Sequence, residues 1–263
     1  MHPVNKLLKV FGFRLSRTDV KSMKMDSKER EYREQYDDYY KQVVENNKRG
    51  FRIFKDYRYQ GGLHPTSAGD IMSEFAASHL YKTKPAKVLD IGSYRLFILG
   101  MLSHFDLTTI DVRERKPFLE NETILTCDAK ALNLADNSFD SVISLGALAH
   151  FGLGRYGDEF DLDADIKAFS EMTRVMKPGG LLIFATLITG GHRHPAILFN
   201  RCRIYDYKMI REFCKSLDLI EEKFYHHRDH KFCSLDELNA DPTPLDHPRP
   251  FDLYLGCWAK RVW

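Results

Sequence analysis

The stretch AKVLDIG, residues 86–92, decides the fold of this chain. It is a short apolar run that ends at a glycine, a pattern typical of a buried β-strand followed by a tight turn. Residues 95–105 then have the pattern of a helix, and residues 107–112 that of a second strand. A strand, a helix and a strand in this order predict a βαβ unit in a mostly parallel sheet.

The same alternation continues to the end of the chain. Further strands are predicted at residues 122–127, 139–146, 181–188, 220–225 and 251–258, and further helices at 162–176 and 205–217. Right-handed crossovers bring the carboxyl ends of parallel strands to one edge, where such sheets bind ligands. Functional residues are therefore expected at that edge.

The first third of the chain is more polar, basic and aromatic than the rest. Residues 27–48 predict a long surface helix with a stripe of tyrosines, and Thr66 or Ser67 is placed to cap a second helix. We therefore predict an N-terminal helical extension over residues 1–84 and a ligand-binding domain over 85–263.

Composition limits the classes of function. The chain has 263 residues, 43% of them hydrophobic, and a formal net charge of only +2, so no nucleic-acid partner is expected. Five cysteines without CxxC spacing argue against a disulfide framework or a thiolate zinc site. Free thiols, with no apolar stretch of about 20 residues and no signal peptide, predict a cytoplasmic protein.

Residues 1–17 leave two interpretations open. Leucines and phenylalanines alternate there with Lys6, Lys9 and Arg14. The pattern suits a basic amphipathic helix in peripheral contact with an anionic membrane. We favour the alternative, a helix whose apolar face packs on its own chain or on a second subunit of a homo-oligomer, because helices with one apolar face are the norm.

Polar residues follow the first three strands. The turn at Gly92 and Ser93 lets the backbone approach a ligand and points helix N–H groups towards it. Asp111, at the end of the second strand, can accept hydrogen bonds from both ribose hydroxyls of a nucleoside cofactor. Asp128, after the third strand, can accept one from an adenine amino group.

Five segments in this order resemble the class I methyltransferases that depend on S-adenosylmethionine (SAM). They are VLDIG (88–92), Asp111, CDA (127–129), DNSFDSVIS (136–144) and RVMKPGGLLIF (174–184). The resemblance covers residues 85–190 well and 85–260 in outline. It implies an α/β, Rossmann-like doubly wound fold, whose mostly parallel seven-stranded sheet has its last strand antiparallel, and SAM as cofactor.

The resemblance also implies a set of cofactor-binding residues: Asp90, Gly92, Ser93, Asp111, Val112, Asp128, Ala129 and Gly146. One departure concerns the glycine turn. The family usually has two further glycines, where this chain has Tyr94 and Leu96. These side chains would crowd the methionine portion of SAM or send the loop along a different course.

The segment SLGALAHFGLGRYGD, residues 144–158, resembles a poorly characterised bacterial sub-family often found among surface-polysaccharide genes. This resemblance implies O-methylation of a small molecule or glycan. Two alternatives stay open: a non-catalytic binding or scaffold protein of the same fold, and a protein or RNA methyltransferase.

Residues after the fourth and fifth strands are candidates for the acceptor site. His150 is either a general base or a residue that shapes the loop. Arg155, Tyr156 and Asp158 either bind substrate or form a capping loop with internal salt bridges. His192 and His194 follow the fifth strand at the same edge, and we predict that the two segments share one pocket.

Three further observations narrow the chemistry. His226, His227 and His230 are metal ligands by type, but no supporting carboxylates can be identified in the sequence, so no metal site is predicted. Arg201 and Arg203 would bind an anionic acceptor or begin a solvated helix. The nucleotide loops GxGxxG and GxxxxGK[ST] and the Pro-Pro tetrapeptide of amino-methylating nucleic-acid enzymes are absent.

Overall fold

The structure is a computed structural model. It describes residues 27–59, 66–116, 122–191, 193–241 and 251–262. The chain divides into two compact units, Met1–Pro65 and Thr66–Trp263. The unit with the sheet thus starts at Thr66, whereas the sequence led us to expect residue 85, because helix α3 (Ala68–Thr83) packs on the sheet.

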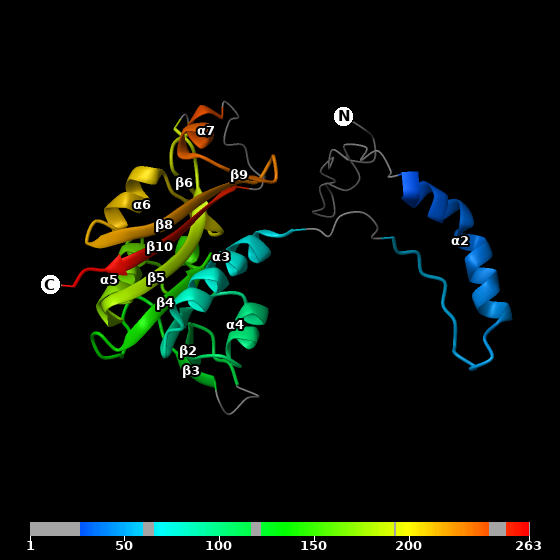
Figure 1. Cartoon of the computed structure of the whole chain (residues 1–263), viewed down its shortest axis with the longest axis horizontal. Helices are drawn as coiled ribbons and strands as arrows, with labels where there is room; N and C mark the ends of the chain where they lie inside the picture. Colours follow the sequence, from blue (N-terminus) through cyan, green and yellow to red (C-terminus); the bar gives the residue numbers. More distant parts are fainter. Residues whose placement is uncertain (1–26, 60–65, 117–121, 192, 242–250, 263) are drawn as a thin grey trace, which may run out of the picture. The chain divides into compact units, whose positions relative to one another are not determined.

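One eight-stranded sheet forms the centre of the second unit, in the order β3-β2-β1-β4-β5-β10-β8-β9 (Figure 1). The strands are β1 (Lys87–Ile91), β2 (Asp106–Asp111), β3 (Glu122–Thr126), β4 (Phe139–Leu145), β5 (Met176–Ile188), β8 (Leu217–His226), β9 (Lys231–Cys233) and β10 (Asp252–Lys260). Strands β1 to β5 pair in parallel, and β10 is antiparallel to both β5 and β8. The predicted Rossmann-like α/β class is confirmed.

The eighth strand was not predicted. Strand β9 has only three residues, Lys-Phe-Cys, and pairs antiparallel with the end of β8. Three residues are too few to show an alternation of apolar and polar side chains, so no strand was predicted there.

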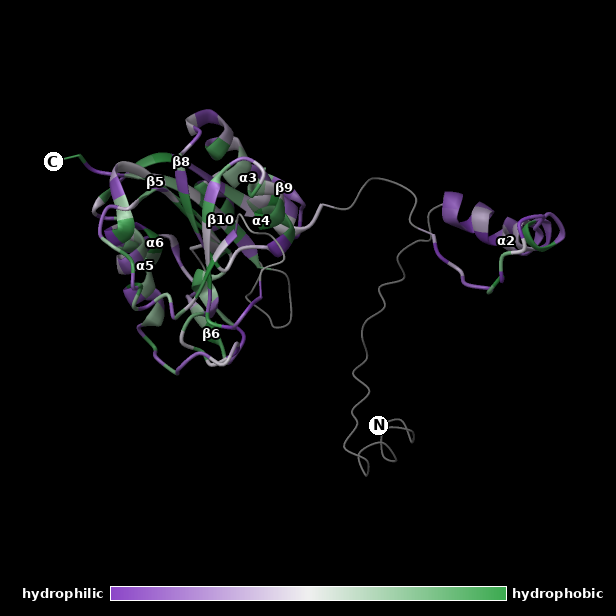
Figure 2. Cartoon of the chain, turned by 90° about the horizontal axis from the view of Figure 1, so that it is seen from below, coloured by the Kyte–Doolittle hydropathy of each residue, from purple (hydrophilic) through white to green (hydrophobic). Residues whose placement is uncertain are grey.

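Helices cover both faces of the sheet. They are α3, α4 (Arg95–Met101), α5 (Ala164–Val175), α6 (Tyr207–Phe213) and α7 (Leu235–Ala240), with a short 3₁₀ helix η2 (Leu148–His150). Helices α3 and α4 lie on one side of the strands, and α5 and α6 lie on the other (Figure 2). Ser67 caps α3, because its Oγ accepts from the Asp70 amide while the Asp70 carboxylate accepts from the Ser67 amide.

The two faces have separate cores, as β5 illustrates. Leu182 and Phe184 belong to the cluster under α5 and α6, whereas Ile183 and Ala185 belong to the cluster under α3 and α4. All four side chains are at most 1% exposed. Burial on both faces explains why this strand is a continuous apolar run and does not alternate.

The segment before α6 differs from the prediction. Residues Ala196–Leu198 (β6) and Cys202–Ile204 (β7) form a two-stranded hairpin, and the helix is shorter than the expected 205–217. Arg203 is only 5% exposed and Tyr205 only 1%, and the Tyr205 hydroxyl donates to Asp165 at 2.9 Å. The side chains of Arg203 and Tyr205 are buried in the interior. Arg203 is therefore neither an anion site nor part of a solvated helix start.

The first unit contains helix α2 (Ser27–Glu45), none of whose residues is buried. Its tyrosine stripe faces its own unit: the rings of Tyr32 and Tyr36 lie 6.2 and 5.1 Å from that of Tyr57. The predicted amphipathic segment 1–17 lies outside the described residues. In the part of the chain that the structure describes, no helix is long and apolar enough to cross a membrane.

A buried carboxylate connects two turns at the ligand-binding edge. The side chain of Glu122 is fully buried and pairs with Arg95, which begins α4, and with Arg115, which follows β2. The Arg95–Glu122 pair has two hydrogen bonds, and Arg115 Nη2 lies 2.9 Å from Glu122 Oε1. Glu122 therefore fixes α4 relative to the loop that carries Asp111.

We expect Glu122→Ala to lower the free energy of unfolding by about 3–5 kcal/mol, because two guanidinium groups lose their buried partner. Urea unfolding followed by circular dichroism measures the change. Glu212→Ala is the matched control, since Glu212 pairs with Lys215 on the exposed surface and its loss should change stability by at most about 0.5 kcal/mol. Equal midpoints for the two variants would refute the structural role of Glu122.

Candidate functional site

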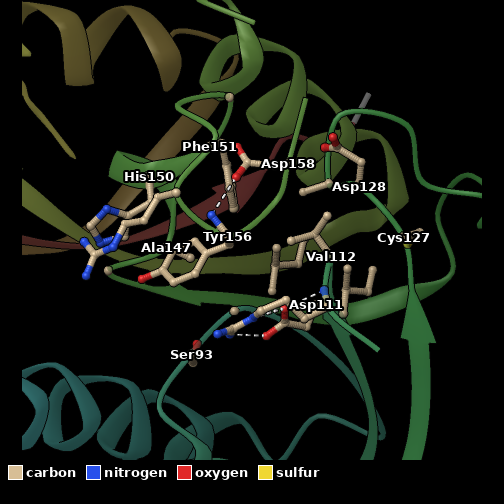
Figure 3. A pocket seen from close by; sticks show the side chains of 18 of the residues that line it. Ser93, Asp111, Val112, Cys127, Asp128, Ala147, His150, Phe151, Tyr156 and Asp158 are labelled. Atoms are coloured by element: carbon tan, nitrogen blue, oxygen red, sulfur yellow. Dashed lines mark hydrogen bonds and ion pairs between the residues drawn. The ribbon is translucent and has the colours of Figure 1, made fainter. Parts of the chain in front are cut away.

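A cavity of about 320 Å³ opens at the carboxyl ends of β1, β2 and β4 (Figure 3). It brings together eleven of the residues selected from the sequence: Gly92, Ser93, Asp111, Val112, Asp128, Ala129, Gly146, His150, Arg155, Tyr156 and Asp158. Figure 3 shows His150 and Asp128 on opposite sides of the view, so the cavity has one end beside Asp128 and another beside His150.

Three selected residues are not part of the described cavity. His194 is exposed and does not line it, so the structure does not bring this side chain into the predicted shared pocket. His192 lies outside the described residues. Asp90 lies behind the turn, where its Oδ2 accepts from the Ser93 amide at 3.3 Å, and burial raises the pKa of its carboxyl to about 7.

The turn after β1 requires a glycine. Gly92 has a φ of +69°, and a Cβ there would lie 2.8 Å from the Cβ of Ala147. Any side chain at position 92 would push the β1 turn away from the loop after β4. Gly92 thus allows the two loops to meet around the cavity.

The two residues that replace the family's other glycines lie differently. Leu96 is 84% exposed on α4 and does not line the cavity, whereas Tyr94 does. The ring of Tyr94 lies against α3, where a Cβ at Gly69 would be only 3.2 Å from it. The absence of a side chain at Gly69 gives the Tyr94 ring its place, and crowding of the methionine portion of SAM by Tyr94 stays a prediction.

Asp111 is held by a neighbour that the sequence analysis did not select. Its Oδ1 accepts from the amide and from Nε of Arg113, both at 2.9 Å, and its Oδ2 accepts from Arg113 Nη2 at 2.7 Å. Burial opposes ionisation, but the hydrogen bonds from Arg113 prevail and lower the pKa of Asp111. The carboxylate is therefore ionised at neutral pH and remains an acceptor.

The end of the cavity beside Asp128 has apolar walls next to this carboxylate. Val112 and Ala129 line it with Cys127, which the sequence analysis quoted without assigning it a role. Asp128 already accepts a hydrogen bond at Oδ1 from the Lys130 amide at 2.9 Å, and this bond fixes its direction. Its other oxygen lies 3.5 Å from the Lys130 ammonium group.

The tautomer of His150 follows from its contacts. Its Nδ1 lies 2.6 Å from the carbonyl oxygen of Arg201, which can only accept, so Nδ1 carries the hydrogen. Burial, followed by the positive charges of Arg155 and Arg201, lowers the pKa of the ring. A neutral ring protonated at Nδ1 has its lone pair on Nε2, as a general base requires.

Hydrogen bonds to the backbone hold the loop after His150. The Asp158 carboxylate accepts from the amides of Gly154 at 3.3 Å and Tyr156 at 3.0 Å. The loop is thus capped internally, by these hydrogen bonds and not by the expected salt bridges. From the hairpin, the buried guanidinium of Arg203 donates to the carbonyl oxygens of Phe151 and Leu162. These bonds leave Tyr156 at the cavity wall.

A second polar cluster lies on β8 and β10. His226, Asp241 and Asp252 are buried with potential metal-ligand atoms within 4.8 Å of one another, and these carboxylates were not identified in the sequence. Arg193 Nη2 lies 3.1 Å from Asp252, and Arg228 Nη1 lies 3.2 Å from Asp241. Since each carboxylate already has a guanidinium partner, side chains within the cluster compensate its charge.

Solved structures resemble the chain in fold. NodS, an N-methyltransferase of Bradyrhizobium japonicum crystallised with S-adenosylhomocysteine (SAH), has a TM-score of 0.50 at 16% identity, covering 73% of this chain and 87% of its own. A Burkholderia thailandensis N1-methyltransferase with bound 1,6-didemethyltoxoflavin and SAH has a TM-score of 0.52 at 14% identity, covering 88% and 86%. The fold is that of the class I methyltransferases.

The fold alone does not determine the reaction. The [4+2]-cyclase SpnF matches equally well, with a TM-score of 0.52 at 18% identity, covering 73% of this chain and 81% of its own. A family profile described as "Caenorhabditis protein of unknown function, DUF268" matches residues 115–241, slightly less than half of the chain. That range includes the loop with His150 but not the turn at Gly92. No curated protein matches the sequence.

We expect the ring of His150 to titrate below pH 6.5, since burial disfavours its charged form. NMR of ¹⁵N-labelled histidine measures this pKa, and the urea-unfolded chain, with a value near 6.5, is the reference. In Arg155→Met the pKa should rise, because one of the positive charges that lower it is removed. Between the folded and unfolded pKa values only the unfolded chain is protonated, so this residue reduces stability as the pH falls below about 6.5. A folded value above 6.5 would contradict the prediction.

Proposed function

We propose that this chain is a SAM-dependent methyltransferase that methylates a hydroxyl oxygen of a small molecule or glycan. The observation that carries the proposal is the single cavity that joins Asp111, the Gly92 turn and the neutral ring of His150. The two methyltransferases crystallised with SAH support the choice of cofactor through their common fold.

The residues around Asp111 and Asp128 fit SAM. Asp111 would accept from the ribose hydroxyls, and Asp128 would accept from the adenine amino group. Val112 and Ala129 would contact the two faces of the base. The side-chain-free surface at Gly92 would let the backbone approach the remainder of the cofactor.

SAM supplies a methyl carbon made electrophilic by its sulfonium sulfur. The part of this chain is to place an acceptor oxygen in line with that carbon and to take up the hydroxyl proton. The hydrogen bond to Arg201 leaves Nε2 of His150 free to receive a proton. This base favours an enzyme over a scaffold protein, because cofactor binding alone does not require it.

The proposal also covers the location and partners of the chain. The sequence pattern supports a cytoplasmic location and contact of residues 1–17 with an anionic membrane. It also supports self-association and a role near surface-polysaccharide synthesis. Vesicle flotation with and without residues 1–17 tests the membrane contact directly.

We expect Asp111→Ala to weaken SAH binding by about 1–3 kcal/mol, that is about 5- to 150-fold, because the ribose hydroxyls lose their acceptor. Titration calorimetry with SAH is the measurement. Asp218→Ala is the matched control, since Asp218 pairs with Arg261 at the opposite edge of the sheet. No binding by the parent chain would remove the cofactor assignment, and equal affinities would remove Asp111 from the site.

We expect His150→Ala to reduce turnover by about 10²- to 10⁴-fold while SAH affinity changes little, because the base acts only on the acceptor. SAH release from SAM, screened over hydroxyl-bearing sugars, sugar acids and sugar phosphates, measures turnover. The exposed His104, replaced by alanine, is the control. Undiminished turnover in His150→Ala would leave this histidine as a residue that shapes the loop.

A further inference from the structure

The end of the cavity beside His150 holds a guanidinium group without a carboxylate partner. Arg113 and Arg155 line this end together with Asp158. Arg113 pairs with Asp111, whereas within the described chain no carboxylate pairs with Arg155. Arg155 instead donates to the carbonyl oxygen of Arg201 at 3.1 Å. Unpaired guanidinium groups beside a cavity are suited to a carboxylate or phosphate ligand.

Tyr156 connects these arginines to one another and to the candidate base. The guanidinium carbon of Arg113 lies 4.7 Å from the centre of the Tyr156 ring, and that of Arg155 lies 5.1 Å from it. The His150 ring packs edge-on against the same ring at 5.8 Å. Contacts therefore run without a break from Asp111, through Arg113 and Tyr156, to His150.

The hydrogen bonds that Asp111 already accepts compete with its proposed role as acceptor for the ribose hydroxyls. A carboxylate has about four acceptor positions, and Arg113 uses three of them with its amide, Nε and Nη2. Two ribose hydroxyls need two positions, so the Arg113 side chain has to give up at least one. The side chain of Arg113 is 59% exposed, and an exposed ion pair is weak enough to be exchanged.

We propose that Arg113 determines acceptor specificity: when the cofactor takes Asp111, Arg113 joins Arg155 in binding an acceptor that bears a carboxylate or phosphate group. This inference rests on the proposed function, because it requires a ribose at Asp111. The Tyr156 ring keeps the released guanidinium near the loop, since cation–π contact persists after the ion pair breaks. The methyl acceptor is accordingly an anionic molecule.

The exchange makes the two binding events cooperative. While Arg113 holds Asp111, the anion site has one guanidinium group, that of Arg155, and after the exchange it has two. An anion that binds Arg113 in turn removes the competitor from Asp111, so anion and cofactor strengthen each other by the same factor.

Titration calorimetry with SAH tests this exchange in the full-length chain. SAH is titrated in chloride, inorganic phosphate and acetate at equal ionic strength. The parent should bind SAH about fivefold more tightly in phosphate or acetate than in chloride. The anion with the effect identifies the group on the acceptor, and an effect of either one supports the proposal.

Two variants distinguish the release of Asp111 by Arg113 from the binding of the anion. Arg113→Ala should bind SAH about threefold more tightly than the parent in chloride, since Asp111 is free, and should gain nothing from either anion. Arg155→Ala should lose the anion effect, because the guanidinium that binds the anion together with Arg113 is removed. Arg261→Ala, which breaks the pair with Asp218 at the opposite edge, should behave as the parent does.

Distinct outcomes would overturn the exchange and the proposed function. If the parent does not bind SAH, the cofactor assignment fails, and the exchange fails with it. If the parent binds SAH but neither anion strengthens binding, or Arg113→Ala retains the anion effect or binds SAH no more tightly than the parent in chloride, the exchange alone is wrong. Arg113→Gln, which keeps the side chain polar, repeats the comparison if the alanine variant does not fold.

Discussion

The close approach of Gly92 to Ala147 is the constraint on which the site depends. A Cβ at position 92 would be 2.8 Å from the Ala147 side chain, so the β1 turn and the β4 loop can meet only because this residue is glycine. Parallel strands bring their carboxyl ends to one edge in any sheet of this class. The missing side chain turns that common edge into one cavity, with Asp111 on one strand and His150 following another.

The loop beside the cavity is held by buried groups on the side away from it. Arg203 binds the carbonyl oxygens at both ends of the loop, and Tyr205 and Arg203 share the carboxylate of Asp165. A buried charge network of this kind is costly unless every member has a partner, so it fixes one position of the loop. Arg155 and Tyr156 owe their place at the cavity to side chains that never reach it.

The sequence was sufficient to predict features that depend on a local pattern. It was insufficient to predict contacts between residues that are distant in sequence. The strand AKVLDIG was predicted from its own apolar run, and Asp111 and the segment with His150 were selected because they lie at or just after the end of a strand. Arg113 was missed, although it is only two residues from Asp111, because a basic residue after a strand has no signature of its own. The carbonyl oxygen of Arg201, which sets the His150 tautomer, is distant in sequence and could not be paired without the fold.

The positive charges beside His150 favour its neutral ring and oppose the protonated ring that would form when it takes up a proton. Arg155 and Arg201 help to keep His150 neutral, but the proton that it would take from a hydroxyl is then repelled by the same guanidinium groups. The negative charge of Asp158 favours the protonated ring, but it opposes this repulsion only in part. An anionic acceptor bound to the arginines would compensate the added charge at the point where it appears. The proposed anion site and the proposed general base would therefore depend on each other.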